Sequence, residues 1–127
     1  MPTWEGIFVD DTCDYAKPNT ELRKMLGSSI RDQYNITKQL IQSIHDASPQ
    51  TKVYVVGYPS FIAGRYAVCT FNSGMLNGDE REMMNEAVRY MNTVLEKAAT
   101  AAGATSINVA EGLNGGRLCE GAEYVTR

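Results

Sequence analysis

The feature that most constrains the fold is a short run of β-branched and aromatic residues, 53–59, with the sequence VYVVGYP. It follows a long segment of helical periodicity and closes with a glycine and a proline. Such a run predicts a buried strand that ends in a turn. In open α/β sheets, ligands bind at the loops that follow the carboxyl ends of the strands. We therefore expect one wall of a substrate pocket in the loop after this strand, made by Tyr58, Pro59, Ser60 and Phe61.

The segment before this strand has the spacing of an amphipathic helix. Apolar residues recur at helical intervals over 22–44, and the Asn-Thr pair at 19–20 can cap the start. The Gly-Ser-Ser sequence at 27–29 should interrupt or kink the pattern, giving a short helix and then a longer one. Pro49 closes the segment, because the residue before a proline is pushed out of the α region.

A second helix is predicted over 79–102. Asp79 can cap its first turn while Glu82 reaches back, as in a capping box. Gly103 is well placed as the left-handed residue that follows the helix. One stripe of the helix is assigned to the core, whereas Glu80 and Arg81 lie mostly off it. The stripe comprises Met84, Val88, Met91, Leu95 and Ala98.

A second strand is predicted at 105–109, with the sequence TSINV. Together with strand 53–57 and the helix between them it forms a βαβ unit, whose strands run parallel. The fold class is therefore α/β, a parallel sheet flanked by helices, in a single domain over 1–127. A third candidate strand is 7–9. Because parallel sheets are buried on both faces and contain several strands, we expect the sheet to be incomplete in this chain.

The composition excludes several classes of protein. With 127 residues, 43% hydrophobic and 21% charged, the chain is of the globular type. Its net charge of -3 gives no basic surface, which argues against nucleic acid as a partner. No apolar run approaches the roughly 20 residues that a membrane span needs. No signal peptide is visible in the sequence. No cofactor is expected.

The three cysteines and the single histidine of the sequence argue against a metal site. Cys13, Cys69, Cys119 and His45 lack the close spacing of a four-ligand zinc site, so no metal is expected. Two interpretations of the cysteines stay open on the count alone. One is a disulfide with one leftover thiol, and the other is three reduced thiols in a reducing compartment.

Several segments occur in an order typical of one enzyme family: LIQSI at 40–44, the run at 53–59, Cys69, the helix end at 92–103 and LNGGRLC at 113–119. Over 30–120 the chain resembles the middle and later part of an SGNH (GDSL-type) hydrolase. More narrowly, it is similar to the branch of secreted actinobacterial esterases and phospholipases. The resemblance implies a flavodoxin-like three-layer α/β/α fold and a disulfide between Cys69 and Cys119. It also implies a secreted, extracellular protein, because disulfides persist in oxidising compartments.

The segments that carry this family's chemistry are absent from the sequence. There is no Gly-Asp-Ser nucleophile segment, no Gly-Asn-Asp oxyanion motif and no Asp-x-x-His pair, and Gly116 stands where the family has a histidine. Those segments supply the nucleophile, its base and the oxyanion donors. We therefore assign no catalytic residue and expect the chain alone to be inactive.

Other residues are poor substitutes for the missing ones. His45 sits near a helix end, where bonding to carbonyls or solvation explains it. Ser60 lacks the Gly-x-Ser-x-Gly elbow that exposes a nucleophile, and a loop serine is usually a turn former. The acidic pairs at 10–11 and 79–80 are explained by capping and solvation.

Three functional hypotheses remain. The first is a portion of a carboxylic-ester hydrolase, a lipase or esterase, acting on a small-molecule or lipid ester once its catalytic residues are supplied. The second is a non-catalytic binding or scaffold module derived from the same family. The third is an unrelated flavodoxin-like binding domain, disfavoured because the turn at 74–78 precedes the acidic Asp79 and is a poor phosphate cradle. In the first two, the remainder of the domain or a second copy of the chain would cover the sheet edges.

Overall fold

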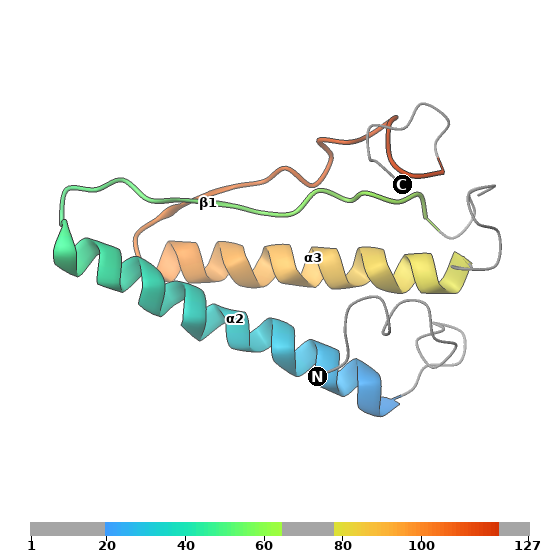
Figure 1. The fold of residues 1–127 in the computed structure, drawn as a ribbon, viewed down its shortest axis with the longest axis horizontal. Helices are drawn as coiled ribbons and strands as arrows, with labels where there is room; N and C mark the ends of the chain where they lie inside the picture. The colour runs from blue at the N-terminus through green and yellow to red at the C-terminus, as the bar shows by residue number, and fades with distance from the viewer. Residues whose placement is uncertain (1–19, 65–77, 120–127) are drawn as a thin grey trace.

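The computed structural model describes residues 20–64 and 78–119, without the side chains of 20–23 and 79. The elements follow in the order α2 (Thr20–Ala47), β1 (Tyr54–Val56), α3 (Gly78–Ala101) and β2 (Thr105–Ile107). Figure 1 shows the two strands along one side of α3, with α2 crossing the other side. The predicted α/β class is confirmed. Within the described part the helices form one layer and the strands another, so a third layer is not among these residues.

Some predictions fall outside the described residues. These are the candidate strand at 7–9, the acidic pair at 10–11, Cys13, Asn19, Cys69 and most of the turn at 74–78.

The first helix is continuous, so the predicted break at 27–29 is wrong. α2 runs for 28 residues through Gly27 without interruption. Leu26 and Ile30 flank the glycine and are buried in one cluster with residues of α3. A glycine inside a helix costs only about 1 kcal/mol, less than burying two large aliphatic side chains contributes. Tertiary packing therefore overrides the local breaker.

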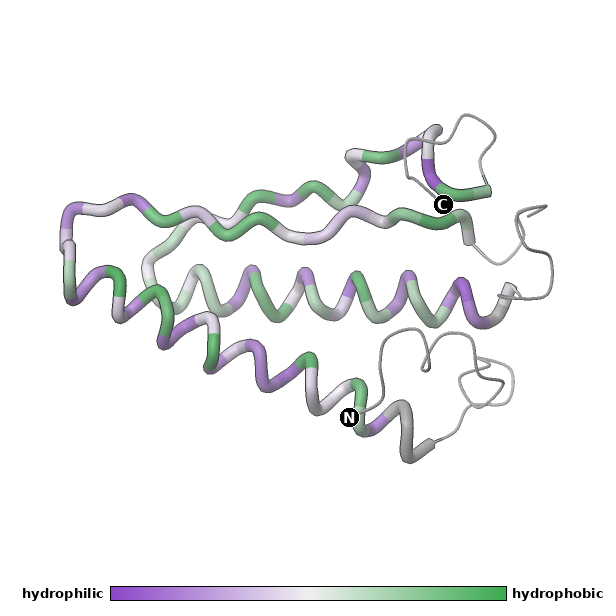
Figure 2. Tube along the Cα trace, viewed as in Figure 1, coloured by the Kyte–Doolittle hydropathy of each residue, from purple (hydrophilic) through white to green (hydrophobic). Residues whose placement is uncertain are grey.

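The second helix agrees with its prediction in extent and in its core stripe. α3 covers Gly78–Ala101, and Gly103 follows with a φ of 78°. The predicted stripe is buried or half-buried throughout, from Met84 to Ala98. Figure 2 shows apolar positions recurring along both helices. Neither described helix has the combination of length and hydropathy that crossing a membrane requires.

The N-terminal turn of α3 differs from the sequence expectation. Glu82 does not reach back but pairs at 3.2 Å with Arg89, which lies two turns further along the same face of the helix. Glu80 and Arg81, placed off the core stripe, are buried. Solvation therefore does not explain Glu80. The cause is tertiary, because the chain following β1 passes over this end of the helix and the Arg81 side chain bonds to it.

Among the described residues the sheet consists of two parallel strands, in the register Tyr54 with Thr105 and Val56 with Ile107. The hydrogen bonds continue past the strands on both sides, from the Thr105 N–H to the Val53 carbonyl and from the Gly57 N–H to the Ile107 carbonyl. β2 is shorter than the predicted 105–109: it ends at Ile107, and a turn begins at Ala110, whose N–H donates to the Asn108 side chain.

Candidate substrate-pocket wall

The chain that leaves β1 remains extended and lies along α3. Tyr58 is 55% exposed, Pro59, Ser60 and Phe61 are half-buried, and Ile62 is fully buried. The structure thus brings the four predicted wall residues together at the carboxyl end of β1. Their part in binding a substrate stays a prediction.

Asn92 of α3 fixes the first residue of this segment through both ends of its carboxamide. Its Oδ1 accepts from the Tyr58 N–H at 2.7 Å, and its Nδ2 donates to the Tyr58 carbonyl at 2.9 Å. The helix approaches closely here, since a Cβ on Gly57 would lie 2.6 Å from Asn92 Oδ1. The position before Tyr58 therefore favours glycine because a side chain there would collide with Asn92, and not because of a left-handed backbone angle.

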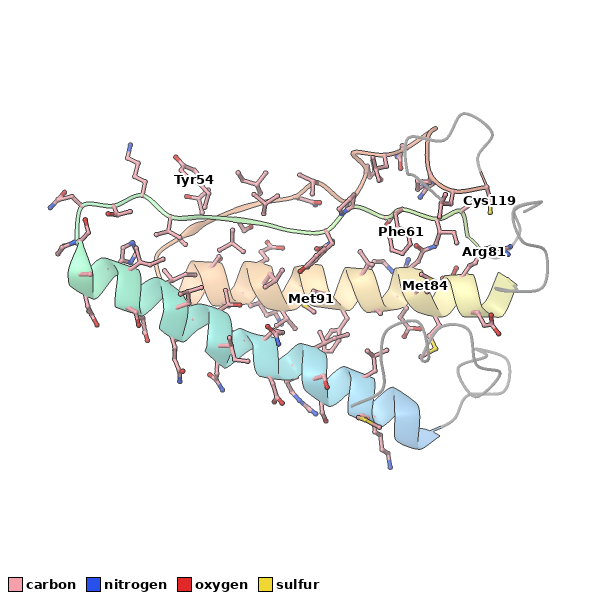
Figure 3. The ribbon with its side chains drawn as sticks, in the orientation of Figure 1. Tyr54, Phe61, Arg81, Met84, Met91 and Cys119 are labelled. Carbon is pink, nitrogen blue, oxygen red and sulfur yellow. The ribbon has the colours of Figure 1, made fainter. Side chains whose placement is uncertain are left out.

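Two more side chains of α3 continue this attachment toward Gly64. Asn85 Nδ2 donates to the Ile62 carbonyl at 3.3 Å, and Arg81 Nη2 donates to the Gly64 carbonyl at 3.4 Å. Figure 3 shows Phe61 and Arg81 in the space between α3 and the extended segment. Positions 81, 85 and 92 recur at helical spacing, so they form one polar stripe facing the segment. Backbone carbonyls that are buried beyond the end of a strand need hydrogen-bond donors of this kind.

The opposite edge of the segment pairs with the chain that follows β2. The Ser60 N–H donates to the Ala110 carbonyl, and the Leu118 N–H donates to the Phe61 carbonyl. The Ala63 N–H donates to the Leu118 carbonyl, which completes a parallel bridge at Ile62. Residues 58–64 are therefore held on both edges, by α3 and by the chain at 110–118, and form a fixed wall.

Sequence reasoning missed the polar stripe of α3. Asn85 and Asn92 read simply as polar positions of an amphipathic helix. The available signal was weak: asparagine is a poor helix former, so two of them inside one helix suggest a role outside it.

Cys119 lies one residue beyond this pairing. It is half-buried, has a φ of 71°, and is disulfide-bonded. Both other cysteines lie outside the described residues, so the predicted pairing with Cys69 stays a prediction.

The substitutes considered for catalysis do not come together. His45 lies ahead of β1, with Nε2 directed at the Thr51 carbonyl at 3.2 Å. Ser60 lies beyond the opposite end of that strand, where its N–H is bonded to Ala110. Within the described ranges no three His, Cys, Asp or Glu side chains group as metal ligands.

A hollow of about 270 Å³ lies between α3 and the strands. Its lining includes Gly57, Asn92, Glu96 and Ser106, and it does not include the predicted wall residues.

The arrangement of helices and strands is similar to part of a known fold. The chain matches the crystal structure of the extracellular lipase from Streptomyces rimosus with a TM-score of 0.72, over 93% of this chain and 47% of that chain. At 24% identity this likeness concerns the fold. No protein-family model matches the sequence.

A sequence relative points in the same direction. Lipase 1 of Streptomyces coelicolor is 35% identical over 83 residues, which are 65% of this chain and 29% of Lipase 1. The chain is thus related to SGNH-type hydrolases over part of its length. It spans less than half of either protein.

Proposed function

We propose that this chain is a portion of an SGNH/GDSL-type carboxylic-ester hydrolase, a lipase or esterase. The serine nucleophile and the Asp-x-x-His pair of that enzyme lie in polypeptide outside the residues of this chain. The observation that carries the proposal is the agreement of two comparisons. The sequence is similar to a lipase, and the fold matches an extracellular lipase. The absence of the family's catalytic segments from the sequence limits the chain to a supporting part.

In the intact enzyme the serine attacks the ester carbonyl, the alcohol leaves with a proton, and water then releases the acid from the acyl-enzyme. The chain supplies the wall formed by Tyr58, Pro59, Ser60 and Phe61, on the acyl or leaving-group side of the pocket. Because the backbone of this wall is already bonded on both edges, little freedom is lost when a substrate binds against it.

The extracellular location and the Cys69–Cys119 disulfide belong to the same proposal. They are supported by the bonded state of Cys119 and by the extracellular lipase of matching fold. Peptide mapping without reduction should recover one linked pair that contains positions 69 and 119, with Cys13 as a free thiol. A link between Cys13 and Cys119 would overturn the pairing.

Hydrolysis of a chromogenic short-chain ester tests the activity. The 127-residue chain should show no turnover above buffer, whereas a longer protein that contains it should hydrolyse the ester and be inactivated by a serine-directed phosphonate. A longer protein without turnover would refute the ester-hydrolase assignment.

A non-catalytic binding or scaffold module is the second candidate. It is favoured by Gly116, which stands where the family has a histidine and is buried beside the bridge at Leu118. Under this alternative the longer protein binds an ester without cleaving it, so equilibrium binding of the intact ester separates the two candidates.

A further inference from the structure

The hollow between α3 and the strands has a polar lining that the proposed function does not use. Its volume of about 270 Å³ is several times the roughly 30 Å³ that one water molecule occupies in the liquid. Asn92, Thr93 and Glu96 line it from α3, and Ser106 lines it from β2. The hollow is therefore large enough for a small organic molecule and offers it hydrogen-bonding groups.

Ser106 stands where the neighbouring strand has an apolar side chain. It pairs with Val55 in the parallel register, and both residues line the hollow. A strand position that faces a covering helix is normally apolar, as Val55 is. The Ser106 hydroxyl forms no hydrogen bond with any residue that the structure describes. This polar group is therefore available to a ligand.

Glu96 gives the hollow its negative charge. Its carboxylate has no hydrogen bond or ion pair within the described ranges. The other charged residue of the lining is Arg89, whose guanidinium pairs with Glu82 at 3.2 Å. Because Glu82 offsets the charge of Arg89, the charge that remains for a ligand is that of Glu96. A positively charged ligand is favoured.

Thr93 narrows the chemistry further, because it can only accept a hydrogen bond from a ligand. Its hydroxyl already donates to the Arg89 carbonyl at 3.0 Å. An ionised carboxylate such as that of Glu96 is also an acceptor only. The two residues are three positions apart on α3 and share one face of the helix. A matching ligand must therefore carry several donors and a positive charge, as a primary ammonium does.

The remaining side of the hollow is mostly apolar. Its apolar lining comprises Val55, Leu95, Ile107 and Ala110. A bare metal ion would make no use of these side chains, and hard cations such as Ca²⁺ and Mg²⁺ need about six or more oxygen ligands. A hydrocarbon body attached to the ammonium would instead be removed from water against them.

We propose that this hollow binds a small primary ammonium ligand with a short hydrocarbon body. The charged end is held by Glu96, Thr93 and Ser106. The hydrocarbon end lies against Val55 and Leu95. Residues of this chain alone form the site, so it does not depend on the ester-hydrolase proposal.

Titration of the full 127-residue chain with pentylamine, followed by amide-resolved NMR at neutral pH, tests the site. We expect saturable shifts of the Ser106 backbone amide and of the Asn92 side-chain amide. Binding should weaken as salt is added, because the ion pair is partly exposed. Pentanol has a similar body without charge, and pentanoate has the opposite charge. Both should bind at least about fivefold more weakly than pentylamine.

Two outcomes of this titration would overturn the proposal. The first is the absence of saturable shifts with pentylamine, which indicates a hollow that holds only water. The second is equal binding of pentanol and pentylamine, which indicates an apolar hollow that does not recognise charge.

A matched pair of variants assigns the charge recognition to Glu96. Glu96→Gln keeps the shape of the side chain and should weaken pentylamine binding at least about fivefold. Glu111→Gln removes the same charge from an exposed position outside the lining and should leave the affinity unchanged. Equal affinities of the two variants contradict the proposed site.

Ser106→Val tests the location independently. It puts the side chain of the paired Val55 on β2, so it should fill part of the hollow and abolish the saturable shifts. The variant should melt no lower than the unmodified chain, since a β-branched residue suits a strand position that faces a helix. Undiminished pentylamine binding by the folded variant would place the ligand elsewhere and overturn the proposal.

Discussion

The side chain of Asn92 and the backbone of Tyr58 form a closed pair of hydrogen bonds, one of 2.7 Å and one of 2.9 Å, that joins α3 to the exit of β1. The two residues are 34 positions apart in the sequence. The pair fixes where the strand stops and where the wall residues begin.

Replacing Asn92 should therefore loosen this junction. Asn92→Ala removes both bonds and leaves the Tyr58 peptide unpaired, at an expected cost of about 1–3 kcal/mol in the free energy of unfolding. Urea denaturation followed by circular dichroism measures it. Thr93→Ala is the control, because it deletes only an exposed bond to the Arg89 carbonyl and should cost less than about 0.5 kcal/mol. Equal losses in the two variants would contradict a special role for Asn92.

Gly57→Ala should be destabilising through the same contact. The added methyl would stand 2.6 Å from Asn92 Oδ1, so the carboxamide must move and its bonds to Tyr58 weaken. We expect a loss of about 1–3 kcal/mol. The double variant with Asn92→Ala should lose less than the sum of the two single losses, since the clash disappears with the side chain. Strict additivity in the urea series would show that the two positions act separately.

Gly27→Ala should be stabilising. No atom lies within 4 Å of the added Cβ, and the position is inside a continuous helix. Alanine is favoured over glycine there by about 1 kcal/mol, which corresponds to a rise of a few degrees in Tm. Gly103→Ala is the opposing control: its space is equally open, but its φ of 78° disfavours a side chain by about 1–2 kcal/mol. Thermal melts of both variants should move in opposite directions.

The cysteines give a redox-dependent prediction that rests on the proposed pairing. A link between positions 69 and 119 closes a loop whose restriction of the unfolded chain is worth about 4 kcal/mol in the chain-entropy model. Cys119→Ser and Cys69→Ser should lower stability to the same extent, and added reductant should have no further effect on either variant. Cys13→Ser should unfold like the unmodified chain under oxidising conditions.

The predictions from sequence succeeded where the signal was local. The VYVVGYP run marks the position of β1, and Gly103 marks the end of α3, because both depend on residues that are neighbours in the chain. The predicted burial of the strand and the turn after it are wrong, because Tyr54 and Val56 are exposed and the chain that follows Val56 stays extended. The predicted break at Gly27 failed, because burial of Leu26 and Ile30 against α3 outweighs a local preference.

The polar stripe of α3 could not be predicted for a related reason. Asn85 and Asn92 bind carbonyls that lie 23 and 34 positions away. No periodicity distinguishes them from ordinary solvent-facing asparagines. Only the close passage of the extended segment over the helix gives these side chains their partners.

The attachment of residues 58–64 has an evolutionary consequence. The bonds from Asn92, Asn85 and Arg81 of α3 to this segment end on peptide groups, at Tyr58, Ile62 and Gly64. The identities of the side chains at 58–61 do not enter these bonds. Selection can therefore exchange the surface offered to a ligand, one residue at a time, while the framework that presents it is inherited unchanged.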